Sequence, residues 1–350
     1  MATSGSTLDL RQSAVKSLTA MMKMAGERNA IQRQTPKRAI NPGPPHVPPR
    51  LFRRVWDAEN RRGLPGDRLL IEEGGALPDS REGWEAYEHT GTTFRFFSEV
   101  FGRNSVDDDG MTLTSSVHYG RANDNASWNG GQMVFGDGDG HVFAPFTRSL
   151  DVVAHEMTHA VVQYTCGLEY SGQSGALNEH FADVFGSLVK QWHLRQKADE
   201  ADWLIGKELI NPMADPPINA RGLRSLMAPG TAYDDEEMGK DPQPAHMQAY
   251  NPTTADSGGV HINSGIPNHA FYLAATAVGG FAWEKLGLVW YKTLDRLSPA
   301  ATFSQCAAAT ISSARAFVPG DDNLEAAITQ AWLKVGVITN EELSAWKLTS

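Results

Sequence analysis

His155, Glu156 and His159 are the residues of this sequence whose types and spacing most clearly suggest chemistry. Positions four apart on an α-helix lie on one face, one turn from each other, so both imidazoles can bind a single Zn²⁺ ion. Glu156 lies beside them and can act on a water molecule at the same ion. The alternative is a buried helix whose histidines form only local hydrogen bonds. A glutamate between two histidines at this spacing favours the metal site.

A zinc site with two histidines needs a third protein ligand, and Glu179 is our candidate. Glu179 and Asp183 lie four residues apart on a predicted helix whose apolar residues follow helical spacing: Leu177, Phe181, Val184, Phe185 and Leu188. A buried carboxylate without a partner is costly, so both acids should be paired or metal-bound. We expect Asp183 and Asn178 to orient the histidines through hydrogen bonds. The alternative for Glu179 is a solvated acid near a helix start.

Several segments together resemble the thermolysin family of zinc metallopeptidases. Residues 155–159 and 175–179 match its metal-binding segments, with Glu179 twenty positions after His159. Residues 256–266 resemble the segment that carries a transition-state-stabilising histidine, and 125–130 with 136–140 are similar to the segment along the substrate. Within the family, 222–225 and 240–247 look most like the protealysin branch. The resemblance extends from about residue 54 to near the C-terminus.

The resemblance implies an α+β fold with two lobes and the zinc site in the cleft between them. We expect a precursor or linker at 1–50, a strand-rich N-terminal lobe at 51–150 and a mainly helical C-terminal lobe at 151–350. The implied activity is that of a zinc-dependent neutral endopeptidase, which hydrolyses internal bonds of peptides and proteins.

The same resemblance implies a role for each catalytic residue. Glu156 takes the proton of a zinc-bound water and later passes it to the leaving amine. Tyr170 and His261 donate hydrogen bonds to the negatively charged oxygen of the intermediate. Asp256, five residues before His261, holds that imidazole oriented and cationic. Without the resemblance, Tyr170 would be interpreted as a core aromatic residue.

Substrate contacts are also implied by the resemblance. Asn125 and the carbonyl of Ala126 would pair with an extended substrate backbone, and Arg224 would bind a substrate carbonyl. A surface turn and a loop charge are the respective alternatives. The implied pocket for the residue after the scissile bond is apolar and consists of Phe143, Phe146, Val152, Ile205, Leu209 and Leu223. We therefore predict cleavage before bulky apolar residues.

Calcium is expected to be absent from one place where some family members bind a pair of ions. The matching positions here are Asp151, Lys190, Asp202, Leu204 and Lys207. Ca²⁺ requires oxygen ligands, which two lysines and a leucine do not supply. A lysine ammonium can neutralise the remaining acids instead. The acidic runs 107–109 and 137–139 could contact Ca²⁺, although turns explain them more simply.

The first 50 residues differ from the rest. Residues 32–50 are basic and rich in proline, which is typical of a linker, and an amphipathic helix is predicted over 8–25. The resemblance implies a precursor segment that inhibits the enzyme until it is removed; a disordered tail is the alternative. Charged residues interrupt any apolar run here. We therefore predict secretion without a conventional signal peptide, or a cytoplasmic location.

Composition restricts the partners. The 350-residue chain has a net charge of −10 and no basic stripe, which argues against a nucleic-acid partner. No apolar run reaches the length of a membrane span. We expect a monomer in which Cys166 and Cys306 are small packing residues, although pairing stays open.

Apolar periodicity predicts helices over 84–101, 151–165, 174–195, 199–209, 264–278, 281–296, 301–317 and 321–335. Short strands are predicted at 117–119 and 132–135, and a long loop at 211–260. Two functional alternatives remain besides an endopeptidase. One is a zinc hydrolase for another acyl substrate, such as an ester or amide. The other is a latent peptidase with mainly a binding role.

Overall fold

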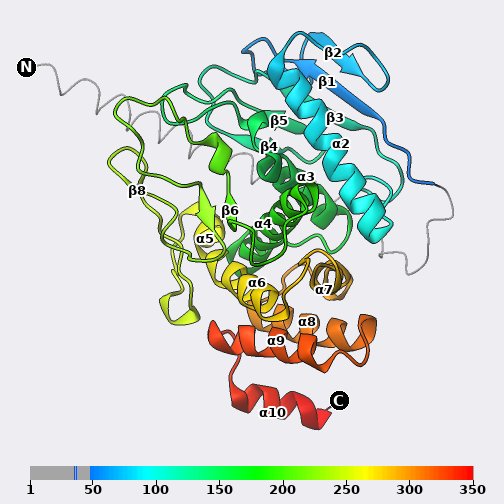
Figure 1. Ribbon diagram of the computed structural model, residues 1–350, viewed down its shortest axis with the longest axis vertical. Helices are drawn as coiled ribbons and strands as arrows, with labels where there is room; N and C mark the ends of the chain where they lie inside the picture. The colour runs from blue at the N-terminus through cyan, green and yellow to red at the C-terminus, as the bar shows by residue number, and fades with distance from the viewer. Residues whose placement is uncertain (1–34, 36, 38–47, 350) are drawn as a thin grey trace, which may run out of the picture.

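The computed structural model describes residues 35, 37 and 48–349, and Figure 1 shows them as a coloured ribbon. The helix predicted over 8–25 and most of the predicted linker lie outside the described residues. No helix among these residues is long and apolar enough to cross a membrane.

A five-stranded sheet forms the N-terminal part of the fold, in the order β2-β1-β3-β5-β4. Its strands are β1 (Arg53–Asp57), β2 (Arg68–Glu72), β3 (Leu113–Val117), β4 (Ala126–Trp128) and β5 (Met133–Phe135). β1, β3 and β5 run parallel, whereas β2 and β4 pair antiparallel with their neighbours. Among the described residues β4 has a strand on one side only. Its other edge is therefore available for contacts with the helices or with a ligand.

Helix α2 (Arg81–Phe101) packs on this sheet. Ser80 caps its first turn by accepting a hydrogen bond from Gly83 N, and Gly102 ends it with a left-handed φ of 72°. Phe94, Phe96 and Phe97 lie on its buried side. The predicted helix at 84–101 is therefore present and begins three residues earlier.

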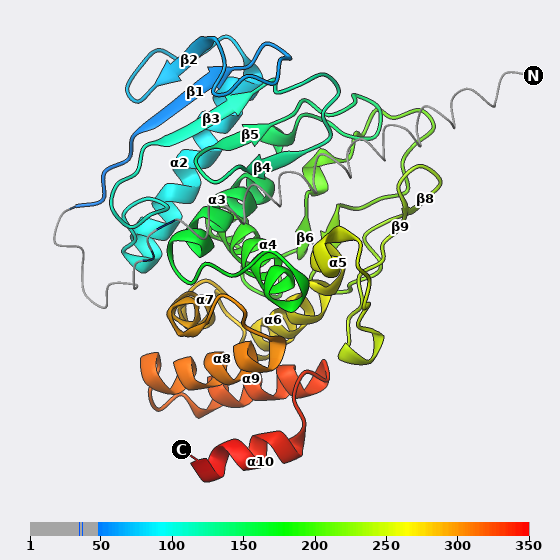
Figure 2. The ribbon, with the colours of Figure 1, turned by 180° about the vertical axis from the view of Figure 1, so that it is seen from behind.

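Helices α3 (Leu150–Tyr164) and α4 (Gly172–Leu194) form the centre of the molecule. Nearly every residue of both is buried, which requires apolar or hydrogen-bonded side chains on all faces. Figures 1 and 2 both place this pair between the sheet and the C-terminal helices. A Cβ added at Gly186 of α4 would lie 2.6 Å from the Asp151 carbonyl oxygen, so glycine permits the close helix crossing.

The C-terminal part is helical: α5 (Asp256–Asn263), α6 (Gly265–Val278), α7 (Lys285–Thr293), α8 (Phe303–Phe317), α9 (Asp322–Lys334) and α10 (Asn340–Thr349). The 3₁₀ turn η4 (Leu294–Arg296) extends α7. Thr302 and Gln305 form a reciprocal capping box at the start of α8. A strand-rich part followed by a helical part confirms the predicted α+β fold.

Two local predictions are wrong. Residues 199–209 form β6 (Leu204–Ile205) and the turn η2 (Lys207–Leu209) instead of a helix, because Trp203 and Gly206 have φ of 55° and 69°. The strand predicted at 117–119 ends at Val117, since His118 has a φ of 54°. The loop predicted at 211–260 is present and has little regular structure: it contains only the two-residue strands β7 (Arg224–Ser225), β8 (Asp234–Asp235) and β9 (Gly239–Lys240), the turn η3 (Met247–Ala249) and the start of α5.

Candidate active site

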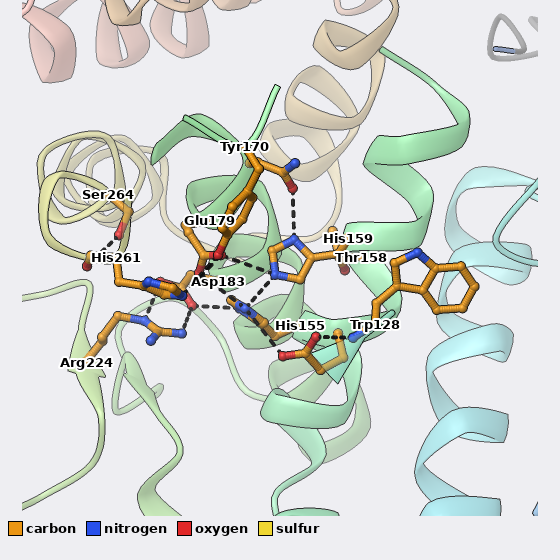
Figure 3. A network of polar contacts seen from close by, with 12 residues as sticks. Trp128, His155, Thr158, His159, Tyr170, Glu179, Asp183, Arg224, His261 and Ser264 are labelled. Atoms are coloured by element: carbon orange, nitrogen blue, oxygen red, sulfur yellow. Dashed lines mark hydrogen bonds and ion pairs between the residues drawn. The ribbon is translucent and has the colours of Figure 1, made fainter. Parts of the chain in front are cut away.

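His155, His159 and Glu179 meet at the crossing of α3 and α4 (Figure 3), and their ligand atoms all lie within 4.8 Å of one another. The Nε2 atoms of the histidines are 3.0 Å apart. Each lies 3.4 Å from an oxygen of the Glu179 carboxylate. All three side chains are buried, and their converging lone pairs could hold a metal ion.

The far nitrogen of each imidazole is held by a residue of α4. His155 Nδ1 lies 2.9 Å from Asp183 Oδ1, and His159 Nδ1 lies 2.8 Å from Asn178 Oδ1. The Asn178 amide nitrogen donates to the Leu168 carbonyl, 3.1 Å away, so its oxygen is the atom that faces His159. Both contacts orient the imidazoles with Nε2 toward Glu179. Asp183 and Asn178 therefore lie where the sequence analysis expects them.

Glu179 is the acidic member of this ligand cluster. Burial raises the pKa of Glu179, but His261, His159 and His155 outweigh burial and hold this pKa well below its ordinary value. Glu179 is therefore a carboxylate. Its Oε2 atom is buried and has no hydrogen-bond partner among the described residues. An unpartnered buried carboxylate oxygen is costly unless a cation binds it.

Glu156 links the helix pair to the edge of the sheet. Its Oε2 accepts a hydrogen bond of 2.6 Å from the backbone N–H of Trp128 in β4, and its Oε1 lies 3.9 Å from His155 Nε2. Peptide groups alternate in direction along a strand. The Asn125 carbonyl and the Asn129 N–H bond toward β5, at Gly136 N and Gln132 O. The backbone N–H and C=O groups of Ala126 therefore point to the free edge of β4, as the backbone N–H of Trp128 does.

Tyr170, His261 and Asp256 form a second group of polar side chains beside the ligand cluster. The Tyr170 hydroxyl donates to Glu179 Oε1 and lies 3.1 Å from His261 Nε2. Asp256 Oδ1 lies 2.6 Å from His261 Nδ1, and Asp256 Oδ2 accepts from His261 N. Burial lowers the pKa of His261, but Glu179 and Asp256 outweigh it and raise this pKa. The imidazole can therefore act as a charged donor.

The chain between Asp256 and His261 folds back on itself. Residues 256–259 all have positive φ, at 52°, 52°, 90° and 74°. A Cβ added at Gly258 would lie 2.9 Å from Gly172 N, at the start of α4. This irregular turn lets the Asp256 carboxylate contact both the backbone and the ring of His261.

Arg224 of β7, which is partly buried, forms a bidentate ion pair with the buried Asp183. Its Nε and Nη2 atoms lie 2.8 and 2.7 Å from the two carboxylate oxygens. Asp183 also contacts His155, so Arg224 is connected to the ligand cluster through this one intervening residue. Burial raises the pKa of Asp183, but Arg224 and His155 outweigh it and hold this pKa well below its ordinary value.

The six residues of the implied pocket belong to the large hydrophobic core or pack against it: Phe143, Phe146, Val152, Ile205, Leu209 and Leu223. Phe143 and Leu223 are only partly buried, whereas Ile205 and Leu209 are fully buried. The rings of Phe143 and Phe146 lie 5.9 Å apart, and Ile205 pairs with Arg224 between β6 and β7. The apolar group is thus adjacent to Arg224, with part of two side chains exposed.

Lys190 occupies the region where calcium is expected to be absent. Its Nζ lies 3.1 Å from Asp151, 3.2 Å from Glu208 and 3.7 Å from Asp202. Burial lowers the pKa of Lys190, but these three carboxylates outweigh it and raise this pKa above its ordinary value. The ammonium thus lies among these acids, and Asp151 and Asp202 are the two that a lysine was expected to neutralise. Glu208 is the member that the sequence analysis missed, because it lies in the misassigned segment 199–209.

Two further sets of buried polar contacts were not foreseen. His180 of α4 contacts Trp290 and Asn268. Gln163 of α3 accepts from Trp128 Nε1 and donates to Gly130 O and to Thr35 Oγ1, 3.2 Å away. In the sequence, the only sign of the first set of contacts is that a histidine, His180, directly follows Glu179. Cys166 and Cys306 are buried and unpaired.

Comparison with known proteins is consistent with this geometry. Residues 56–163 match the family described as "Thermolysin metallopeptidase, catalytic domain", and residues 166–337 match "Thermolysin metallopeptidase, alpha-helical domain". An extracellular metalloprotease of Pectobacterium carotovorum subsp. carotovorum is 51% identical over 293 residues, which cover 83% of this chain and 82% of the relative. Protease PrtS of Photorhabdus sp. (strain Az29) is 49% identical over 298 residues, or 83% and 78% of the two chains.

Among solved structures, the precursor of protealysin, a metalloproteinase from Serratia proteamaculans, is similar with a TM-score of 0.80 and 51% identity. The match covers 83% of this chain and 89% of that one.

The predicted location is contradicted by these findings. We expected a cytoplasmic protein or secretion without a conventional signal peptide, whereas the Pectobacterium relative is named an extracellular metalloprotease. The expectation relied on charged residues that interrupt an apolar run, and that pattern tests for one kind of export signal only.

Proposed function

The chain belongs to the thermolysin family and is a metallopeptidase, and from this premise we propose that His155, His159 and Glu179 bind one catalytic zinc ion. The observation that carries the proposal is the set of distances among their ligand atoms. Zinc bound tetrahedrally at about 2.1 Å separates its ligand atoms by about 3.4 Å. Here the two Nε2 atoms are 3.0 Å apart, and each lies 3.4 Å from a different oxygen of the Glu179 carboxylate. The unpartnered Glu179 Oε2 provides the charge that a cation would neutralise.

Bound zinc lowers the pKa of a water ligand and polarises a carbonyl group. Glu156 is the base that we assign to this water. The Trp128 N–H fixes one of its oxygens, at 2.6 Å, and its other oxygen lies 3.9 Å from His155 Nε2, beside the proposed metal site. The same carboxyl group then protonates the leaving amine.

Tyr170 and His261 are the donors that we assign to the oxygen of the scissile carbonyl. The Tyr170 hydroxyl and His261 Nε2 are 3.1 Å apart and both adjoin Glu179. Asp256 orients the imidazole through Nδ1 and leaves Nε2 to donate. Each such donor contributes about 3 kcal/mol to transition-state stabilisation in comparable enzymes.

Substrate is proposed to bind along the free edge of β4. The Ala126 carbonyl would accept a hydrogen bond from an extended peptide, and the Asn125 side chain would bind the next peptide group. Two donors of Arg224 are committed to Asp183, and its remaining N–H groups can bind a substrate carbonyl. The apolar group around Phe143 and Leu223 would receive a bulky apolar side chain after the scissile bond.

The segment 1–50 is proposed to be a precursor that is removed on maturation. The similar solved structure is described as the precursor of protealysin. In this chain Thr35 contacts Gln163, which also binds the Trp128 side chain, so the segment is in contact with the structure that holds the β4 edge. We further propose that the enzyme is a monomer and that a cleft containing the zinc site lies between the parts 51–150 and 151–350.

The test is the Glu156→Gln variant of the full chain, assayed with casein, with zinc content measured on the same sample. We expect one zinc per chain and a loss of hydrolysis of about 10²- to 10⁴-fold, the usual contribution of general acid–base catalysis. Glu325→Gln is the matched control, because this glutamate forms an exposed ion pair with Arg315. Undiminished hydrolysis by Glu156→Gln would exclude Glu156 as the base. A folded wild-type protein that binds no zinc would exclude the metal assignment.

A further inference from the structure

A line of buried hydrogen bonds leads from α7 to the metal-ligand cluster. Trp290 Nε1 donates to His180 Nε2 at 2.9 Å. His180 Nδ1 lies 2.9 Å from Asn268 Oδ1, and Asn268 Nδ2 donates to Asp183 Oδ2 at 2.9 Å. Asp183 Oδ1 lies 2.9 Å from His155 Nδ1. Trp290, His180, Asn268 and Asp183 have no exposed surface, so water cannot replace any of these contacts.

The chemistry of its first member fixes the direction of the whole line. An indole N–H can only donate, so His180 Nε2 must be an acceptor and the imidazole must be neutral with its proton on Nδ1. This proton can be given only to the amide oxygen of Asn268. The Asn268 amide nitrogen therefore faces Asp183, and every N–H in the line points toward the carboxylate.

Asp183 is saturated by this arrangement. A carboxylate has about four lone-pair sites. Here Asn268 Nδ2 and Arg224 Nε donate to Oδ2, while Arg224 Nη2 and His155 Nδ1 lie within hydrogen-bond distance of Oδ1. The carboxylate plane is thus held from three sides. With that plane fixed, His155 must present Nδ1–H to Asp183 and Nε2 to the metal.

We propose that His180 and Asn268 are positioning residues for the metal ligand His155, and that they act by locking the Asp183 carboxylate with the Trp290 indole as the anchor. This inference rests on the proposed zinc site. It goes beyond Asp183 itself, because the residues that set the geometry belong to α6 and α7 and to a face of α4 that points away from the metal.

The competing interpretation is that these groups merely satisfy one another in the core. The two interpretations predict different zinc affinities once the anchor loses its N–H. Without the indole donor, the His180 proton can move to Nε2, and Nδ1 then requires a donor. Asn268 can supply one only by reversing its amide, which places its oxygen against Asp183 Oδ2. Two acceptors in contact repel, so the carboxylate should shift and His155 should be held less firmly.

Trp290→Phe removes the N–H while it keeps an aromatic ring. Trp332→Phe is the matched control: Trp332 is also fully buried, donates its Nε1–H to Thr310 Oγ1 at 2.8 Å, and stacks on Trp290 with ring centroids 6.4 Å apart. Both variants lose one indole hydrogen bond and similar volume in the same region of the core. Only Trp290→Phe removes a hydrogen bond that belongs to the line to Asp183.

The readouts are the zinc dissociation constant of the full chain, from competition with a chelator of known affinity, and the melting temperature. We expect Trp290→Phe to weaken zinc binding by about tenfold, which is the lower end of the effect of residues that support metal ligands. Trp332→Phe should bind zinc as tightly as wild type does, although its melting temperature should fall by a similar amount. Zinc-saturated Trp290→Phe should have a reduced kcat with KM little changed. Equal zinc affinity in the two variants would overturn the inference.

Asn268→Ala provides a second test that does not depend on Trp290→Phe folding. It removes the donor to Asp183 directly and should weaken zinc binding by tenfold or more. Wild-type zinc affinity in this variant would also overturn the inference. Absence of zinc from folded wild-type protein is a different result, because it refutes the proposed function rather than the role of His180.

Discussion

Replacing Lys190 with methionine should destabilise the enzyme through Asp151. The ammonium lies 3.1 Å from the Asp151 carboxylate, which has no exposed surface, and near the partly exposed acids Glu208 and Asp202. Methionine keeps much of the side-chain volume but removes the cation beside Asp151 and Glu208, whereas Asp202 keeps its ion pair with Lys207 at 3.3 Å. Ser149 Oγ and Gly206 N still bond to Asp151, so the carboxylate is not stripped of all partners.

The magnitude follows from burial. Removing one partner of a buried ion pair costs about 3–5 kcal/mol, whereas each exposed partner adds at most about 1 kcal/mol. For a folded body of about 300 residues the entropy of unfolding is about 0.6 kcal/mol per kelvin, so we expect a melting temperature lower by about 5–8 °C. Burial raises the pKa of Asp151 even with the ammonium present, and the ammonium lowers it, so loss of Lys190 should raise this pKa further. We therefore expect the loss of stability to be smaller at pH 5 than at pH 8. At pH 8 Asp151 is charged in the unfolded chain, whereas burial in the folded chain disfavours the charged form.

Calcium distinguishes lost charge from lost packing. Lys190→Glu adds oxygen ligands to the acids of this cluster, and oxygen ligands are what Ca²⁺ requires. In calcium-depleted buffer at fixed zinc this variant should melt below Lys190→Met. Calcium at 100 times its dissociation constant should then restore about 2.7 kcal/mol, or about 4–5 °C. Wild type should gain less than this variant from the same calcium.

The control for these variants is Lys285→Met. Lys285 is 61% exposed and forms an ion pair of 2.6 Å with Asp321, so its loss should change the melting temperature by about 1 °C or less. The reasoning is refuted if Lys190→Met melts within 1 °C of Lys285→Met. A calcium response of Lys190→Glu no larger than that of wild type would show that the cluster is not a cation site.

Three further predictions concern activity and pH. Tyr170→Phe should lower kcat by about 10²-fold with KM nearly unchanged at full zinc occupancy, and a loss under threefold would exclude Tyr170 as an oxyanion donor. Leu223→Ala should reduce kcat/KM by about 5- to 30-fold for a peptide with Leu after the scissile bond and much less for one with Ala there; equal losses would contradict the assigned pocket. The hydrogen bond to Asp137 raises the pKa of His118, so its stabilisation is complete below the ordinary pKa near 6.5 and is lost as pH rises through the raised one. Thermal unfolding should therefore separate wild type from Asp137→Asn at pH 6 and not at pH 9, and a difference that grows with pH would contradict this assignment.

The proposed metal ligands could be predicted because their relation is local. His155 and His159 are one helical turn apart, and helical periodicity alone determines that they share a face. Asp183 was placed by the same reasoning, four residues from Glu179 and on the same face. The structure brings these side chains to the positions expected.

Other parts could not be predicted because nonlocal geometry decides them. The segment 199–209 has helical composition, yet Gly206 adopts a left-handed φ so that β6 can pair with β7, and a Cβ there would lie 2.7 Å from Leu223. The sheet order also requires pairing between β1 and β3, which are separated by α2 in the chain. Apolar periodicity predicts where an element lies and cannot identify its partner.

His180 illustrates why the support of a site is harder to infer than its ligands. On a helix it is rotated by about 100° from Glu179, so it points away from the face that binds the metal. Sequence alone favours a satisfied core histidine, and its contacts with Trp290 and Asn268 fit that description. Its relevance appears only because Asn268 of α6 turns the line of hydrogen bonds back to Asp183, three residues after His180. Helix α4 thus carries the proposed ligand Glu179 on one face and His180 on another. Through Asn268, His180 fixes the orientation of Asp183 on the same helix, and Asp183 in turn orients the proposed ligand His155 on α3.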